Sequence, residues 1–159
     1  MKRILIEAGS LAVLGLFIFF MLREPSMSAA PFDELRTRLV QTSVLPEDAA
    51  SGNSSLSLRR NYGLDAETLG DVIYCPPKDF MDVDEILIAR TPDASLRKKL
   101  RAAAEERLES QKNTFENYGT FQYQRLSDAV LYERGDYFVL IVAEHPDAVL
   151  RDVRKEIEN

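Results

Sequence analysis

The chain has 159 residues and a formal charge of −6 at pH 7, with 45% hydrophobic residues, one cysteine and one histidine. An acidic chain of this kind lacks the dense cationic surface that sequence-independent nucleic-acid binding requires, so we expect no nucleic-acid partner. The single cysteine excludes an intramolecular disulfide and a cysteine-rich zinc site, and the single histidine excludes a multi-histidine metal centre. We therefore expect no cofactor.

The first 25 residues contain a long apolar run. Residues 4–22 carry only one charge, Glu7, and at about 1.5 Å per residue they span about 28 Å, close to the hydrocarbon thickness of a bilayer. Lys2 and Arg3 precede the run, and positive charge tends to stay in the cytoplasm. The sequence therefore predicts an N-terminal membrane anchor or signal segment over residues 1–25 and an extracytoplasmic domain over residues 26–159. A cleaved signal peptide and a buried helix of a soluble domain stay open as alternatives.

The first half of the domain contains two expected helices and two expected strands. Residues 31–40 predict a helix with one apolar stripe, and residues 43–57, rich in Ser, Asn, Pro and Gly, predict a loop. Residues 72–75 and 85–89 are expected strands, the first closed by two prolines that cannot donate hydrogen bonds to a sheet. The longest predicted helix covers residues 93–118, with apolar residues at three- and four-residue spacing and Gly119 as its C-cap.

The second half predicts a hairpin and a final helix. Residues 129–133 and 137–143 are strands joined by a turn at Gly135, and residues 146–158 form a helix. Because residues 137–143 are almost wholly apolar, we expect this strand to be interior and covered by the stripe of the long helix.

An internal similarity links the two halves. Residues 86–97 and 140–151 are identical at six of twelve positions without a gap, and each has a Pro-Asp pair where a helix is expected to begin. The similarity allows two β-β-α units. The predicted fold class is α+β: a four-stranded, mostly antiparallel sheet with helices on one face, preceded by an N-terminal transmembrane helix.

The residue types that commonly carry catalysis occur here without visible partners. His145 stands where a helix N-cap is expected, and Cys75 ends a strand, where we expect it to be buried. Four acidic residues, Asp79, Asp82, Asp84 and Glu85, form a cluster whose irregular spacing and lack of glycine favour a solvated loop over a weak cation site. We therefore assign no catalytic, cofactor-binding or metal-binding residues.

One dense basic patch stands out on the acidic chain. Its members crowd the expected start of the long helix, where cations oppose the helix dipole. They are Arg90, Arg97, Lys98, Lys99 and Arg101. A solvated face offset by nearby glutamates is one interpretation, and a surface for an anionic partner in the envelope is the other.

Scattered residues carry a family resemblance. They are Tyr62-Gly63-Leu64, Val83-Asp84-Glu85-Ile86, Arg107-Leu108-x-x-Gln111 with Phe115 and Tyr118, then Leu126, Ala129 and Gly135-Asp136-Tyr137. In this order the chain resembles a bacterial family catalogued as domain of unknown function 4358, over most of residues 31–145. The resemblance implies an extracytoplasmic protein with a signal or lipoprotein-type N-terminus, although the lipoprotein cysteine is absent here. It implies no activity and no catalytic residues.

The sequence therefore favours a membrane-anchored, extracytoplasmic, non-enzymatic binding module of the bacterial cell envelope. Its partners would be the membrane, through residues 4–22, and another envelope or membrane protein. A secreted ligand-binding domain and an acid-dependent hydrolase are the alternatives. A polar pocket with paired carboxylates would favour the enzyme, and an exposed apolar patch would favour the binding module.

Overall fold

A computed structural model describes residues 32–50 and 54–158. The elements in chain order are α2 (Phe32–Gln41), η1 (Glu47–Ala50), α3 (Ser54–Tyr62), α4 (Ala66–Leu69), β1 (Asp71–Cys75), β2 (Glu85–Arg90), α5 (Ala94–Phe115), α6 (Thr120–Ser127), β3 (Val130–Arg134), β4 (Tyr137–Val142) and α7 (Pro146–Glu158). The transmembrane helix predicted within residues 4–22 lies outside the described residues. Within residues 32–50 and 54–158, no helix combines the length and the apolar character that a membrane crossing requires.

The four strands form one open antiparallel sheet in the order β1-β2-β4-β3. This confirms the predicted α+β class and the four-stranded antiparallel sheet. All six residues of β4 are buried, and β4 lies between β2 and β3, as its apolar sequence predicts. A strand that is apolar on both faces must be covered on both faces.

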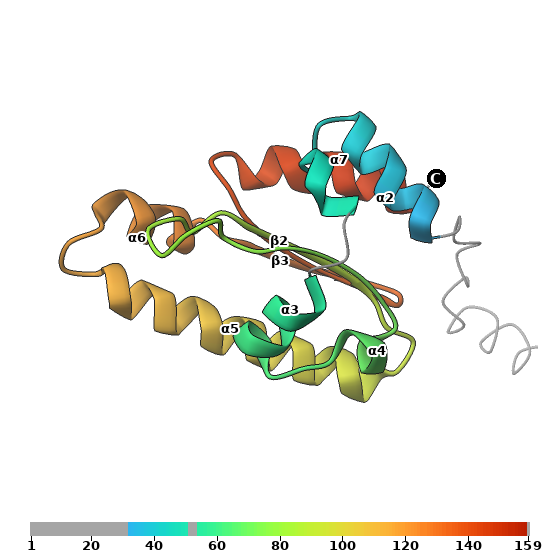
Figure 1. Cartoon of the computed structure of the whole chain (residues 1–159), viewed down its shortest axis with the longest axis horizontal. Coiled ribbons are helices and arrows are strands. Elements are labelled where there is room, and N and C mark those ends of the chain that lie inside the picture. The colour runs from blue at the N-terminus through green and yellow to red at the C-terminus, as the bar shows by residue number, and fades with distance from the viewer. Residues whose placement is uncertain (1–31, 51–53, 159) are drawn as a thin grey trace, which may run out of the picture.

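Helices cover the sheet on both faces, so the prediction of helices on one face is wrong (Figure 1). One core joins Phe138, Leu140 and Val142 of β4 to α3, α4, α5 and α6, including the predicted stripe of α5. The other core joins Val139 and Ile141 to α2 and α7. The physical reason lies in β4 itself, because its alternate residues present apolar side chains to both layers.

The two similar segments lie in similar local elements but on different faces. The chain order does give β1-β2-α5 and β3-β4-α7, yet α5 and α7 cover opposite faces of the sheet (Figure 1). The equivalent residues Leu87 and Ile141 accordingly belong to different cores. Asp93 caps α5 by accepting from the N–H groups of Ser95 and Leu96, whereas α7 begins at its proline. The sequence similarity therefore reflects a shared strand-to-helix connection. The two units differ in the face of the sheet that their helices cover.

The helices α3, α4 and α6 and the short 3-10 helix η1 were not predicted. The expected loop over residues 43–57 contains the start of α3, and the expected long helix ends at Phe115, after which α6 begins. Gly119 lies between α5 and α6 and permits their close turn, because a Cβ there would come within 2.5 Å of the Phe115 ring. The α5–α6 turn brings the exposed face of α6 beside the loop between β1 and β2.

Candidate functional site

Glu85, the first residue of β2, is the centre of a buried polar cluster. Its side chain is 1% exposed. The hydroxyls of Tyr62 and Tyr74 donate to Oε1 at 2.7 and 2.6 Å, and Nε of Arg107 donates to both carboxylate oxygens at 3.0 and 2.9 Å. A buried carboxylate needs this compensation, because an isolated buried charge is strongly unfavourable. The expectation of a solvated acidic cluster is therefore wrong for Glu85.

The electrostatics of this cluster favour a structural role, and we call Glu85, Tyr62, Tyr74 and Arg107 the Glu85 clamp. Burial raises the pKa of Tyr62 and of Tyr74, and the Glu85 carboxylate raises both further. Burial acts to lower the pKa of Arg107, but Glu85, Tyr74 and Tyr62 together outweigh burial, and the pKa of the guanidinium is raised. The hydroxyls therefore stay neutral and the guanidinium stays charged. The cluster fastens α3 and α5 to the sheet through a buried, hydrogen-bonded ion pair, and its two hydroxyls and its guanidinium are not poised to exchange a proton near neutral pH.

A groove of about 320 Å³ adjoins this clamp. The residues that line it come from α3 and α5: Asn61, Tyr62, Ala103, Glu106, Arg107, Ser110 and Gln111. Oε1 of Gln111 is buried and has no hydrogen-bond partner within the part of the chain that the structure describes. The groove can hold a water molecule or a small ligand that donates a hydrogen bond.

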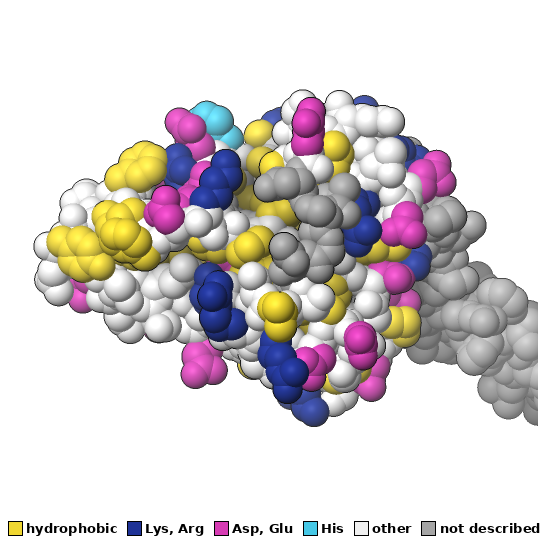
Figure 2. Space-filling model, viewed as in Figure 1, with side chains coloured by type: hydrophobic (Ala, Val, Ile, Leu, Met, Phe, Trp, Pro, Cys, Tyr) yellow, Lys and Arg dark blue, Asp and Glu magenta, His cyan; other side chains and the backbone are white. Residues whose placement is uncertain are grey.

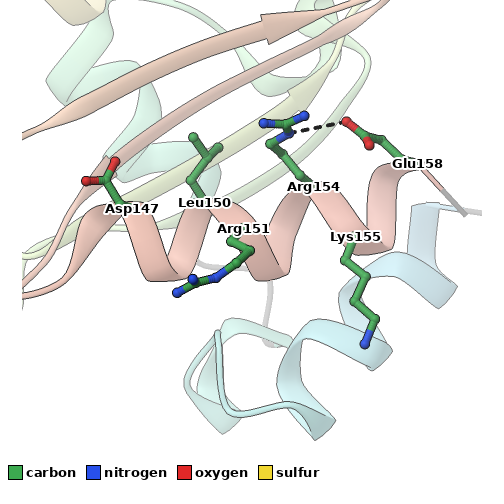
Figure 3. A pocket seen from close by; sticks show the side chains of 6 residues that line it. All are labelled: Asp147, Leu150, Arg151, Arg154, Lys155 and Glu158. Atoms are coloured by element: carbon green, nitrogen blue, oxygen red, sulfur yellow. Dashed lines mark hydrogen bonds and ion pairs between the residues drawn. The ribbon is translucent and has the colours of Figure 1, made fainter.

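A wider depression of about 650 Å³ runs along α7 (Figure 3). The residues that line it are Asp147, Leu150, Arg151, Arg154, Lys155 and Glu158. Because all of them belong to one helix, a ligand there would be contacted from one side only. Arg154 is already paired with Glu158 at 3.2 Å. The depression is therefore an open surface, unlike the concave, enclosing shape of most ligand sites.

The predicted basic patch lies at the start of α5, and the fold neutralises much of it. Lys98 and Lys99 are exposed. The three arginines form ion pairs: Arg90 with Asp71, Arg97 with Asp136, and Arg101 with Glu105 and Glu133. Arg97 also donates to the backbone oxygen of Pro92 at 3.0 Å. Arg97 and Arg101 join the start of α5 to the β3–β4 hairpin, Arg90 joins β2 to β1, and the charges of all three arginines are compensated within the domain.

The remaining acidic residues of the cluster fold their own loop. Oδ1 of Asp79 accepts from the N–H groups of Met81 and Asp82 at 2.8 and 3.0 Å, and Asp82 accepts from the N–H group of Asp84 at 3.0 Å. Asp84 pairs with Arg125 at 2.6 Å. In residues 32–50 and 54–158, no group of three acidic, histidine or cysteine side chains is placed to hold a metal ion.

His145 and Cys75 lie at the ends of strands. The side chain of His145 is exposed, and its backbone oxygen accepts from the N–H groups of Ala148 and Val149 in the first turn of α7, which agrees with a position at the helix start. Cys75 is half-buried at the end of β1 and packs against the core on the α2 and α7 side of the sheet. His145 thus stands at the start of a helix as expected, whereas Cys75, which was expected to be buried, is only half-buried.

An exposed apolar surface lies at one end of the domain, and we call it the aromatic tip. It consists of Phe80, Met81, Tyr118, Phe121 and Tyr123. In the described ranges these are five of the six large hydrophobic side chains that are exposed, the sixth being Leu56. Figure 2 shows hydrophobic side chains gathered at this end of the molecule. Phe80 is 87% exposed, so its ring contributes little to the folded core.

The tip is built from two segments that are distant in sequence. The β1–β2 loop supplies Phe80, and α6 supplies Phe121. The Gln122 side chain donates to the backbone oxygen of Met81 at 3.2 Å, and the Arg125 guanidinium lies 4.3 Å from the Phe121 ring centre. The Gln122 hydrogen bond and the ion pair of Arg125 with Asp84 hold the two segments together, whereas the contact of Arg125 with Phe121 lies within α6. The tip lies at the opposite end of the domain from the first turn of α2 (Figure 1).

Sequence analysis missed both the Glu85 clamp and the aromatic tip. Three residues of the clamp, Tyr62, Glu85 and Arg107, do belong to the motifs on which the family resemblance rests. A signal for the tip was present in Phe80-Met81, a pair of large apolar residues flanked by Asp79 and Asp82.

The fold and its sites define a class: an α+β domain with a four-stranded antiparallel sheet between two helical layers, a buried ionic clamp and an exposed aromatic end. The chain belongs to the family described as domain of unknown function (DUF4358), whose model matches residues 47–143. The resemblance noted in the sequence is thereby confirmed. The match contains the sheet, α3 to α6 and the tip, whereas α2 and α7 lie outside it. Neither the curated proteins nor the solved structures gave a match to the chain.

Proposed function

We propose that this chain is a membrane-anchored, extracytoplasmic module of the bacterial cell envelope that binds another protein and acts by contact rather than catalysis. The aromatic tip is the observation that carries the proposal. Five exposed large hydrophobic side chains at one end of a domain are costly in water, and a contiguous exposed patch marks an interaction site.

The position of the tip fits the proposed anchoring. An anchor over residues 1–25 leads through residues 26–31 to the start of α2, and the tip lies at the other end of the domain (Figure 1). The tip would then face away from the bilayer, where a second envelope protein could reach it. Anchoring itself is tested by alkaline carbonate extraction. We expect a membrane-bound species with the full mass of 18.0 kDa. A mature chain beginning near Ala29 in the medium would instead support the secreted alternative.

The chemistry of Glu85 supports contact over catalysis. An acid-dependent hydrolase needs a carboxyl group that can reach its substrate and change its protonation state. Glu85 already accepts hydrogen bonds from Tyr62, Tyr74 and Arg107, and Glu106, which lines the groove between α3 and α5, is exposed to solvent. The contacts of Glu85 therefore support a role in holding the domain together, with Arg107 as its counter-ion.

The test is photo-crosslinking in cells that express the full chain. A photoreactive phenylalanine derivative replaces Phe80 or Phe121 at the tip, or Leu56 in α3 as the matched control, because Leu56 is also apolar and 78% exposed. We expect a protein adduct at both tip positions and none at position 56. Equal adducts at all three positions, or no adduct at the tip, would contradict the proposal.

A second candidate function, small-ligand binding in the groove between α3 and α5, is favoured by the buried and unpartnered oxygen of Gln111. The groove also offers the cationic Arg107 and the anionic Glu106, so free α-amino acids are the matching probes. Calorimetric titration with these amino acids should give heat that Gln111→Leu abolishes. If the wild-type chain gives no heat, the groove holds only water.

A further inference from the structure

We infer that the aromatic tip binds a protein surface that has an apolar centre and a rim of lysine or arginine. This inference rests on the proposed function and adds the chemistry of the partner. Its basis is the charge that surrounds the five apolar side chains of the tip.

The two segments that form the tip are acidic. Residues 76–84 and 116–128 carry five acidic and two basic residues. One of the two cations, Arg125, has a side chain only 13% exposed and lies in ion pairs with Asp84 and Glu144. The exposed potential around the tip is therefore negative, and charges of this kind at the rim of an interface set its specificity and its association rate.

The acidic residues of these two segments, which we call the acidic rim of the tip, argue against two other occupants of the tip. In a contact between two copies through their tips, the same acidic segments would meet, and like charges facing each other across an interface are unfavourable. An anionic bilayer surface would repel the tip for the same reason. A partner with basic residues around an apolar centre satisfies both the aromatic side chains and the rim.

The aromatic side chains themselves suit the centre of a protein interface. Tyrosine and other aromatic residues are enriched at positions that dominate binding energy, where the surrounding ring of polar residues excludes water. Phe80 and Phe121 project from different elements, and these elements are held together by the hydrogen bond of Gln122 to Met81 and the ion pair of Arg125 with Asp84. The tip is thus formed before binding, which lowers the cost of association.

The experiment removes the rim charge and keeps the loop. In the double variant Asp79→Asn and Asp82→Asn, Oδ1 of each new side chain still accepts from the N–H groups of Met81, of residue 82 and of Asp84, and only the bond from the Lys78 N–H group to Oδ2 at position 82 is lost. Asp152→Asn is the matched control, since Asp152 is an exposed acidic residue on α7, outside the tip segments. Both changes are made in the full chain, in native membranes, with the photoreactive residue at position 121.

We expect the double variant to lower the yield of the protein adduct by at least about threefold, and Asp152→Asn to leave it unchanged. The wild-type yield should fall when ionic strength rises from about 0.01 to about 1 M, because the screening length shrinks from about 30 to about 3 Å, and the double variant should respond less. The adduct peptide of the partner should contain lysine or arginine beside apolar residues. Circular dichroism of the purified variants verifies that they are folded.

The remaining outcomes separate the two proposals. A tip-specific protein adduct whose yield changes neither in the double variant nor with ionic strength would overturn the inference and leave the proposed function unaffected. An adduct of two copies of the chain, or an adduct with lipid alone, would also overturn the inference. The absence of any tip-specific adduct would overturn both proposals.

Discussion

The two ends of α5 carry exposed side chains of opposite kinds, and the fold treats them differently. At and just before the start of α5, the three arginines of the basic patch pair with carboxylates of β1, of the β3–β4 hairpin and of α5 itself. Beyond the end of α5, the rings of Phe80 and Phe121 extend into solvent. The charges at the start therefore help complete the domain, whereas the aromatic side chains of the tip are left for a partner. The basic patch stays a prediction for an anionic partner through Lys98 and Lys99.

The largest expected effect lies between these two ends, at the clamp. Arg107→Met removes the cation that compensates the buried Glu85 and should lower the free energy of unfolding by about 3–5 kcal/mol, the usual cost of breaking a buried ion pair. Urea denaturation of a chain that begins at Ser26 measures this change. Arg107→Lys, which retains the positive charge, should cost clearly less. Equal losses for both variants would mean that the charge is not what the site requires.

The apolar stripe of α5 gives the next effect. Leu108 belongs to the core between α5 and the sheet, so Leu108→Ala should lower the free energy of unfolding by about 2–5 kcal/mol through lost burial and a residual cavity. The midpoint of urea denaturation tests this directly. A midpoint equal to that of the wild type would show that α5 does not pack on β4 as described.

Alkaline pH should weaken the clamp. The pKa values of Tyr62 and Tyr74 are raised in the folded chain, so above about pH 10 the unfolded chain loses protons that the folded chain keeps. Stability should therefore be full below that pH and fall above it. The free energy of unfolding, measured across this range, should fall less steeply in Tyr62→Phe. If the free energy of unfolding falls equally steeply with pH in the variant and in the wild type, the pKa of Tyr62 is not raised by folding.

The tip should show a loss of binding without a loss of stability. Phe80→Ser should weaken the complex formed at the tip by at least about tenfold, which corresponds to about 1.4 kcal/mol. Because Phe80 is exposed, the free energy of unfolding should change by no more than about 0.5 kcal/mol. Crosslinking yield at position 121 and urea denaturation measure the two quantities. Leu56→Ser serves as control and should leave the yield unchanged. An equal loss of yield in Leu56→Ser would mean that the effect of Phe80→Ser is not specific to the tip.

The smallest effect is expected at the start of α5. Lys98 is exposed and lies off the apolar stripe, so Lys98→Glu should change the free energy of unfolding by less than about 0.5 kcal/mol. It should also leave the adduct at position 121 unchanged. A reduced adduct would instead place the basic patch within the binding surface and break the comparison between the two ends.

The sequence predicted the elements that follow a simple period or composition. All four strands and the interior position of β4 could be predicted, because runs of buried apolar residues are distinctive. The helices on both faces could have been inferred from the same run, since an apolar strand has two faces to cover. In α6, by contrast, the sequence Thr120–Ser127 has one buried residue, Leu126, and so presents no apolar stripe to recognise.

The clamp could not be predicted, for a different reason. Glu85 follows two aspartates in the sequence, and its partners Tyr62, Tyr74 and Arg107 are 23, 11 and 22 residues away. Only the packing of α3, β1 and α5 brings them together. The tip likewise depends on a tertiary contact, because α6 and the β1–β2 loop become neighbours only once α5 and the sheet are packed.

The most direct test of the account compares the two ends of α5 inside the cell. In a chain carrying Cys75→Ser, a single cysteine replaces either Phe121 or Lys98, and the rate of its reaction with a membrane-permeant maleimide is measured in cells and in the purified chain. Both replaced side chains are exposed in the isolated domain. If the tip docks on a partner, position 121 should react several-fold more slowly in cells than in the purified chain, and position 98 should react equally in both. Equal reactivity of position 121 in cells and in the purified chain would contradict the central claim.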